Sequence, residues 1–230
     1  MQKTAIVFGA SGLTGSTLLN ELIQHPHYQK IKVFNRRSYS YDHPNVEEHL
    51  IDFSQMDEYA HEFKAEDVFC CLGTTLKKAG SREKFRAIDH DLPVQIARIC
   101  LNNQCETFIA ISSIGARAKS SNYYLRTKGN MEQDILNLDF RYQGFVRPSM
   151  LLGSRKESRP AETAGKIIMK LLSFLLVGRL KKYRGIHVQK VAKAMITIAN
   201  HATDLAKEGK HFFESDELQE LAEKYNHDRP

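Results

Sequence analysis

Three polar side chains could together exchange a proton with a carbonyl compound. Tyr124 and Lys128 stand at positions i and i+4, which on a helix places the phenol and the ammonium group on one face. The positive charge would favour the phenolate form, so that Tyr124 could give and take a proton near neutral pH. Ser112 and Ser113 close the preceding apolar run, and a serine hydroxyl there could orient and polarise the carbonyl group. Neighbouring strand residues point to opposite faces, so only one of the two serines should enter the site.

The same tyrosine–lysine spacing occurs a second time, at Tyr28 and Lys32. This copy lies just before the second predicted strand, and no strand-end serine precedes it. The spacing alone is therefore weak evidence, and an accidental pair is the alternative for either copy. The surrounding residues favour the copy at Tyr124 as the catalytic one.

A glycine-rich turn near the start of the chain has the spacing GxxGxxG. It follows the apolar run at residues 5–8 and precedes a helical pattern, as in the first turn of a dinucleotide-binding unit. Such a turn needs glycines because its backbone bends sharply and approaches a pyrophosphate, which the helix N-terminus then binds. An ordinary strand-to-helix turn is the alternative, and the position at the first strand favours cofactor binding. The residues expected to contact the cofactor here are Gly9, Ser11, Gly12, Leu13, Thr14 and Gly15.

The residues after the second predicted strand indicate which dinucleotide is bound. An NAD site usually has an acidic residue there for the ribose hydroxyls, whereas this chain has Arg36 and Arg37. Guanidinium groups bind a ribose phosphate, which a carboxylate would repel. Two solvated surface arginines are the alternative, and their position favours NADP(H).

Two further strand ends are expected to border the cofactor. Asp52 and Phe53 close the third strand, where the carboxylate could accept a hydrogen bond from adenine or could cap the next helix. Leu72 and Gly73 close the fourth strand, and the glycine would permit close approach to the cofactor ribose.

Short apolar runs alternate with helical patterns over the first two thirds of the chain. Strands are expected at residues 5–8, 31–34, 46–51, 67–72, 107–112 and within 140–146, and helices at 13–23, 56–63, 85–101 and 123–138. Ser120, Ser121 and Asn122 are candidate caps for the last of these helices. The alternation predicts an α/β fold, a Rossmann-type doubly wound parallel sheet.

The last third of the chain has a different pattern. It predicts a helix at residues 167–177, a basic stretch, a helix at 188–199, a strand at 211–213 and a helix that starts at Ser215. We therefore expect a single domain of residues 1–230, with a cofactor-binding core at 1–150 and a small C-terminal substrate lobe at 151–230. The apolar helix and its basic end could instead contact an anionic membrane surface or a protein partner, although a buried helix is favoured.

Composition narrows the classes of partner and compartment. The 230 residues carry a net charge of +6, which favours anionic partners, and no module or patch typical of nucleic-acid binding is present. The four cysteines form no CxxC pair and no histidine pair has metal-ligand spacing, so reduced thiols and no metal are expected. No signal peptide is recognisable, and a cytoplasmic location is expected.

These motifs resemble the short-chain dehydrogenase/reductase superfamily, in its atypical extended branch. They are most similar to the Tat-interacting-protein (metastasis-suppressor) type of oxidoreductase. The resemblance rests on the glycine loop, the YxxxK pair, the serine pair, and the segments 70–75, 78–80, 119–122, 147–148 and 157–160. It implies an NADP(H)-dependent oxidoreductase that acts on a small carbonyl or alcohol compound.

The resemblance also implies roles for individual residues. Ser113 rather than Ser112 would face the substrate, and Leu151 and Arg159 would lie near the nicotinamide. Asp89 falls where many relatives have an active-site asparagine, and Gln189 and Lys190 replace acidic residues of the family's C-terminal segment. The lobe is short for the extended branch, so a cofactor-sensing regulatory protein with little turnover is the alternative function. Oligomeric state and substrate identity are not predicted.

Overall fold

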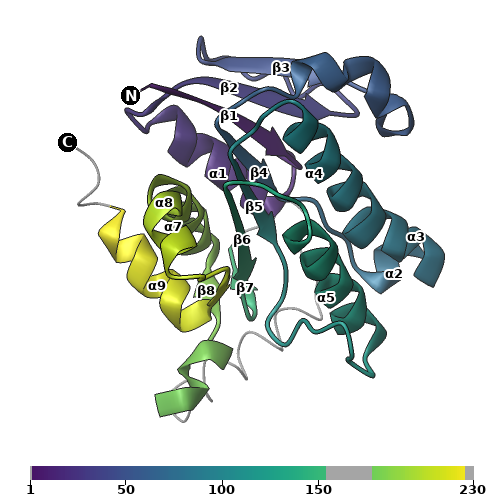
Figure 1. Ribbon diagram of the computed structural model, residues 1–230, viewed down its shortest axis with the longest axis vertical. Helices are drawn as coiled ribbons and strands as arrows, with labels where there is room; N and C mark the ends of the chain where they lie inside the picture. Colours follow the sequence, from purple (N-terminus) through teal and green to yellow (C-terminus); the bar gives the residue numbers. More distant parts are fainter. Residues whose placement is uncertain (1, 154–177, 226–230) are drawn as a thin grey trace.

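The computed structural model describes residues 2–153 and 178–225, which form a parallel sheet covered by helices on both faces (Figure 1). The sheet has seven strands in the order β3-β2-β1-β4-β5-β6-β9, and every neighbouring pair is parallel. Its strands are β1 (Lys3–Phe8), β2 (Tyr28–Asn35), β3 (Val46–Leu50), β4 (Asp67–Cys70), β5 (Thr107–Ile111), β6 (Tyr142–Arg147) and β9 (Phe212–Glu214). The expected doubly wound α/β fold is confirmed.

Each face of the sheet has its own apolar core. On one face, α1 (Leu13–Ile23), α7 (Val188–Asn200) and α9 (Ser215–Lys224) pack together, with α8 (Ala202–Lys207) beside them (Figure 1). On the other face, α4 (Leu92–Asn102) and α5 (Tyr123–Leu136) cover the strands, and the 3-10 segment η1 (Phe53–Glu62) lies at their edge. Buried side chains on both faces explain why the central strands β1, β4 and β5 are apolar runs rather than alternating patterns.

Two helical segments differ from the sequence-based expectation. The helix expected at residues 56–63 is the 3-10 segment η1, which begins earlier and is kinked at Gln55. The helix expected at 85–101 is continuous but composite, with α3 (Arg82–Arg86), a π-helical turn η2 (Ala87–Asp91) and then α4. A short helix, α2 (Leu76–Ala79), precedes it. The π turn places Asp89 and His90 in the interior.

Part of the segment expected to form a C-terminal lobe belongs to the main fold. β9 adds the seventh strand beside β6, and α7 packs on α1. A second, two-stranded sheet pairs β7 (Leu151–Leu152) with β8 (Ile186–His187), and the 3-10 segment η3 (Gly178–Tyr183) precedes β8. The apolar helix expected at 167–177 lies outside the described residues. No helix within residues 2–153 or 178–225 has the length and apolar character needed to cross a membrane.

Candidate functional site

The glycine loop joins β1 to α1 and leaves the start of the helix open. Gly12 is the N-cap of α1, and it has no side chain to bind the first helical N–H groups. Gly9 has φ +80°, and a Cβ there would lie 2.9 Å from the backbone carbonyl of Cys71. A Cβ on Gly15 would lie 2.1 Å from the carbonyl oxygen of Gly9. The three glycines therefore permit a tight turn, an unobstructed helix N-terminus and close packing of the helix on the turn.

The loop lies at the point where the strand order reverses. β1 has β2 on one side and β4 on the other, and in open parallel sheets ligands bind at the carboxyl end of such a switch point. The contact between Gly9 and Cys71 brings the loops after β1 and β4 together at that end. Ser11 and Gly12 are exposed, Leu13 is half-buried and Thr14 is buried. Leu72 is half-buried and Gly73 is exposed, so the loop after β4 is accessible to a ligand where the cofactor is expected.

Arg36 and Arg37 directly follow β2 and are both exposed. Neither forms an ion pair with another described residue, so both guanidinium groups are available. Their loop is held by Glu48 of β3, which accepts hydrogen bonds from Asn35 Nδ2 at 2.8 Å, Ser38 Oγ at 2.8 Å and the backbone of Tyr39 at 2.9 Å. Sequence analysis did not single out Glu48, since a glutamate in an edge strand has no distinctive pattern.

Asp52 caps the next element. Its carboxylate accepts from the backbone N–H of Ser54 at 2.9 Å, and this hydrogen bond lowers the pKa of Asp52. Asp52 was expected either to bond the adenine or to cap the next helix, and in the structure it caps η1. Phe53 packs against Phe8 of β1, with ring centroids 6.4 Å apart.

Tyr124 and Lys128 are one turn apart on α5, which Asn122 caps through its side chain. Tyr124 is half-buried, and its ring lies 5.5 Å from that of Phe85 on α3. Lys128 is 2% exposed, and its Nζ donates to the carbonyl oxygen of Ile111 at the end of β5 at 3.3 Å. The expected helix and the expected pair are thus present at the carboxyl end of the sheet.

A buried carboxylate that sequence reasoning left without a partner faces this lysine. Asp89 Oδ1 lies 2.9 Å from Lys128 Nζ, and Asp89 Oδ2 accepts from the backbone N–H of Thr74 at 2.8 Å. Burial works to lower the pKa of Lys128, but the Asp89 carboxylate, and less strongly Tyr124, hold this pKa above its usual value. A Cβ on Gly73 would lie 3.3 Å from Asp89 Oδ1 and 3.6 Å from Lys128 Nζ. The pair therefore borders the loop after β4.

The two candidate serines both follow the end of β5. The Ser112 side chain is buried, and its hydroxyl has no hydrogen-bond partner among the described residues. Ser113 is half-buried and makes a long hydrogen bond of 3.4 Å to the carbonyl oxygen of Ile114. The choice of Ser113 therefore stays a prediction.

The second tyrosine–lysine pair has a structural role. Tyr28 begins β2, at the amino end of the sheet, and its hydroxyl donates to Asp67 Oδ2 at 2.8 Å. Burial, with the neighbouring Asp67 carboxylate, raises the pKa of Tyr28 well above its ordinary value. Lys3 bonds to the same carboxylate oxygen at 2.8 Å. This buried, protonated phenol is unsuited to proton exchange, as the sequence context predicted.

The segment after β6 reaches the glycine loop. Leu151 lies in β7 and is half-buried. A Cβ on Gly153 would lie 2.9 Å from Val188 and 3.3 Å from Leu13, so the segment after β7 packs directly beside the glycine loop. Sequence analysis missed Gly153, whose neighbours come from distant segments. Arg159 lies outside the described residues.

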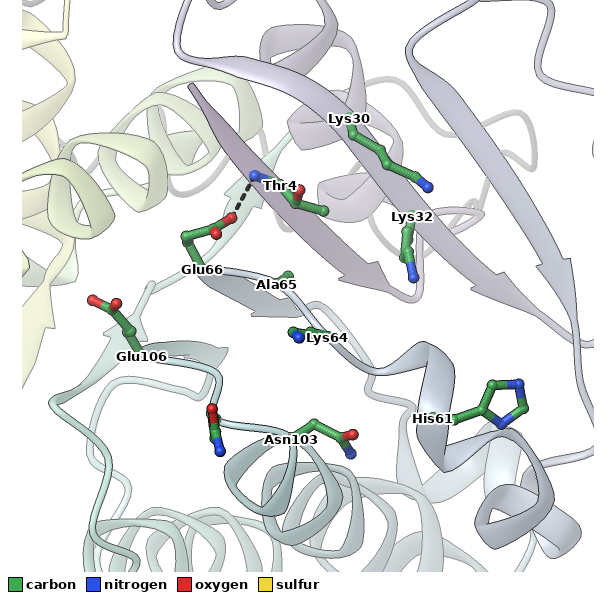
Figure 2. A pocket seen from close by; sticks show the side chains of 10 residues that line it. Thr4, Lys30, Lys32, His61, Lys64, Ala65, Glu66, Asn103 and Glu106 are labelled. Atoms are coloured by element: carbon green, nitrogen blue, oxygen red, sulfur yellow. Dashed lines mark hydrogen bonds between the residues drawn. The ribbon is translucent and has the colours of Figure 1, made fainter. Parts of the chain in front are cut away.

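An open hollow of about 380 Å³ lies at the opposite, amino end of the strands (Figure 2). Lys30, Lys32 and Lys64 line it together with Glu66 and Glu106. Lys32 Nζ lies 2.9 Å from Glu62, and Glu66 accepts from the backbone of Thr4 at 2.7 Å. The hollow contains none of the predicted site residues, and its charges are largely paired. We therefore place the candidate site at the carboxyl end.

The glycine turn, the open helix N-terminus and the parallel sheet define a dinucleotide-binding Rossmann domain. The model of the NAD dependent epimerase/dehydratase family matches residues 5–212, and the chain belongs to this family. It is 38% identical over 164 residues to Protein HTATIP2 of Rattus norvegicus, which covers 70% of this chain and 67% of that protein. It is 30% identical over 201 residues to Protein FMP52, mitochondrial, of Saccharomyces cerevisiae, over 84% and 86% of the two chains. The resemblance to atypical short-chain dehydrogenases/reductases is confirmed.

Solved structures share the fold. MoeE5 in complex with UDP-glucose and NAD matches with a TM-score of 0.65 at 15% identity, over 99% of this chain and 83% of that one. The UDP-Glc/GlcNAc 4-epimerase of Campylobacter jejuni matches with a TM-score of 0.65 at 14% identity, over 98% and 84%. At 14–15% identity these structures show the shared fold, while membership of the NAD dependent epimerase/dehydratase family supports a nicotinamide cofactor.

One expectation is overturned. The chain was expected to be cytoplasmic, yet FMP52 proteins of Candida glabrata, Saccharomyces cerevisiae and Candida albicans are named as mitochondrial. The expectation rested on the lack of a recognisable signal peptide, and that criterion does not detect other targeting routes.

Proposed function

We propose that this chain is an NADP(H)-dependent oxidoreductase that transfers hydride to or from a small carbonyl or alcohol compound, with Tyr124 as acid and base. The observation that carries the proposal is a continuous series of contacts at the carboxyl ends of the central strands. Gly9 touches the loop after β4 at Cys71, and Gly73 in that loop borders Lys128. The glycine loop and the Tyr124–Lys128 pair are therefore neighbours in space, although they are far apart in sequence.

The cofactor would be held by groups that the fold leaves free. The open N-terminus of α1 would bind the pyrophosphate, and the exposed Arg36 and Arg37 would bind the ribose phosphate. Gly12 and Gly73 have no Cβ that would block the approach. When bound, the nicotinamide supplies or accepts the hydride.

The chain's own residues would handle the proton. Tyr124 would donate its phenolic proton to the carbonyl oxygen in reduction and take it back in oxidation. Ser113 would donate a hydrogen bond to the same oxygen and fix its orientation. Lys128 would stabilise the phenolate and reach the cofactor ribose.

A cofactor-sensing protein with little turnover is the second candidate. The specific observation in its favour is the ion pair between Lys128 and Asp89, because a paired ammonium stabilises a phenolate less than a free one. In this function NADPH binding would alter the affinity for a protein partner.

The decisive experiment is a screen for NADPH oxidation over carbonyl compounds, followed by two phenylalanine variants. We expect Tyr124→Phe to reduce kcat by about 100-fold or more, because it removes the proton donor and keeps the ring. Tyr123→Phe is the matched control, since Tyr123 is the neighbour on α5 and its hydroxyl only donates to the Arg82 carbonyl at 2.9 Å. Wild-type kcat in Tyr124→Phe would disprove the role of this tyrosine. If no compound is turned over and NADPH still binds and changes partner affinity, the sensing function is supported.

A further inference from the structure

Asp89, which forms a buried ion pair with Lys128, has no role in the proposed function. The two side chains are 1% and 3% exposed, respectively, and both lie at the centre of the site. Placing a carboxylate here is costly unless its oxygens are bonded. One oxygen of Asp89 forms an ion pair with the ammonium group at 2.9 Å, and the other accepts a hydrogen bond from the backbone N–H of Thr74.

Asp89 therefore connects two elements that border the site. Through Thr74 it holds the loop after β4, and through Lys128 it holds α5. The residue itself projects from the π-helical turn η2, a local widening of the helix that is frequent at functional sites. An asparagine could supply only one acceptor oxygen and carries no charge, so it could not bond the Thr74 N–H and also form an ion pair with the ammonium group.

The other titratable groups near Lys128 do not balance its charge, so Asp89 does. The Cys70 thiol faces it from β4, but burial raises the pKa of Cys70 to about 11, so this group is neutral. His90, next to Asp89, lies between Asp91 at 2.7 Å and Asp134 at 3.0 Å and interacts with those two carboxylates instead. The remaining neighbour is Tyr124, which lies one helical turn away.

Building on the proposed function, we propose that Asp89 is a positioning residue that fixes the Lys128 ammonium group and offsets the charge it presents to Tyr124. Without the carboxylate, the phenolate of Tyr124 would be the counter-ion left to the buried ammonium group among the described residues. The carboxylate thus limits how far Lys128 can promote ionisation of the tyrosine. This sets the pH range in which Tyr124 can exchange its proton.

The test is a titration of Tyr124 by NMR in the cofactor-free full chain, labelled at the ring Cζ of tyrosine. Tyr124→Phe assigns the signal among the nine tyrosines. We expect Asp89→Asn to lower the titration midpoint of Tyr124 by about one pH unit or more, because an unbalanced positive charge favours the phenolate. Asp89→Asn with Lys128→Met should bring the midpoint back to within about 0.5 unit of wild type, since neither charge remains.

The double variant separates an effect through Lys128 from a merely structural one. A midpoint that does not move in Asp89→Asn, or a shift that persists in the double variant, overturns the proposal. If Asp89→Asn fails to fold, Lys128→Met carries the test: the unbalanced carboxylate should raise the midpoint, and an unchanged midpoint overturns the proposal.

The proposed function is tested by separate measurements. NADPH affinity and turnover of the wild-type chain are independent of this titration. If the titration midpoints shift as expected but the chain binds no NADPH, the proposed oxidoreductase function is wrong. The proposal that Asp89 offsets the charge of Lys128 then still holds.

Discussion

Gly12 and Gly15 lack a side chain for different physical reasons. Gly12 is exposed, has an ordinary φ of −78°, and its nearest obstacle to a Cβ is the Gly9 carbonyl at 3.2 Å. Gly15 lies inside α1, where a Cβ would overlap the same carbonyl at 2.1 Å. The first glycine keeps space for a ligand, and the second permits the helix to pack on its own loop.

We predict that Gly12→Val removes NADPH binding and changes the free energy of unfolding by less than about 1 kcal/mol. The valine would occupy the path of the pyrophosphate, and its Cβ would require only a small shift of the Gly9 carbonyl, which lies 3.2 Å away. Gly15→Val is the contrasting variant, and we expect it to lower stability by several kcal/mol because the carbonyl cannot move aside. Calorimetric titration and thermal unfolding measure both effects. Unchanged NADPH affinity in Gly12→Val would mean that the loop is only a turn.

At this scale the sequence predicted residue types and their order but not their partners. The GxxGxxG spacing and the Tyr124–Lys128 pair follow from local rules, so they could be read directly. The Asp89–Lys128 ion pair could not, because it forms between two helical segments whose approach depends on the whole sheet. The hydrogen bonds of Glu48 were missed for the same reason.

At the scale of elements, the edge strand β3 orders the loop that carries the arginines. Burial works to raise the pKa of Glu48, but the hydrogen bonds from Tyr39, Asn35 and Ser38 lower it overall. A group whose folded-state pKa is lowered stabilises the fold above its ordinary value of 4.5, and this stabilisation is lost as the pH falls through the folded-state pKa. The loop should therefore loosen in acid.

We predict that Glu48→Gln increases hydrogen exchange across residues 36–45 at neutral pH. An amide has one acceptor oxygen and cannot satisfy all three donors. Glu47→Gln is the matched control, because Glu47 is the neighbour in β3 and pairs with Lys30 and His49 instead. Equal exchange in the two variants would show that Glu48 does not order the loop.

The positions of the elements were largely predictable, whereas their details were not. Helix α1 has the expected bounds, and Asn122, one of three candidate caps, is the residue that caps α5. The π turn at Ala87–Asp91 was missed because no residue type or spacing distinguishes a π turn from the α-helix around it. The 3-10 character of η1 was missed for a similar reason, since both helix types bury the same apolar residues.

For the whole molecule, the main difference from expectation is where the C-terminal segment belongs. β9 has only three residues, too few for a pairing partner to be read from its pattern, and it pairs with the distant strand β6. Phe213 in β9 is buried in the same core as α1 and α7. Residues 202–225 therefore contribute side chains to the same core as α1.

We predict that Phe213→Ala lowers the free energy of unfolding by about 3–5 kcal/mol, since it removes a buried ring from the shared core. Unfolding should stay a single transition, observed together by circular dichroism and tyrosine fluorescence. Tyr39→Ala, at an exposed position, is the control and should change stability by less than about 0.5 kcal/mol. Separate transitions for the two probes would contradict one shared core.

Paired titrations with NADPH and NADH measure whether a phosphorylated nicotinamide cofactor binds at the carboxyl end of this sheet. We predict that the wild-type chain binds NADPH more tightly, because Arg36 and Arg37 are exposed and form no ion pair with another described residue where the ribose phosphate would lie. Replacing both with alanine should weaken NADPH binding by about tenfold or more and leave NADH binding nearly unchanged. Equal affinities in the wild-type chain, or an equal loss for both cofactors in the variant, would contradict the account.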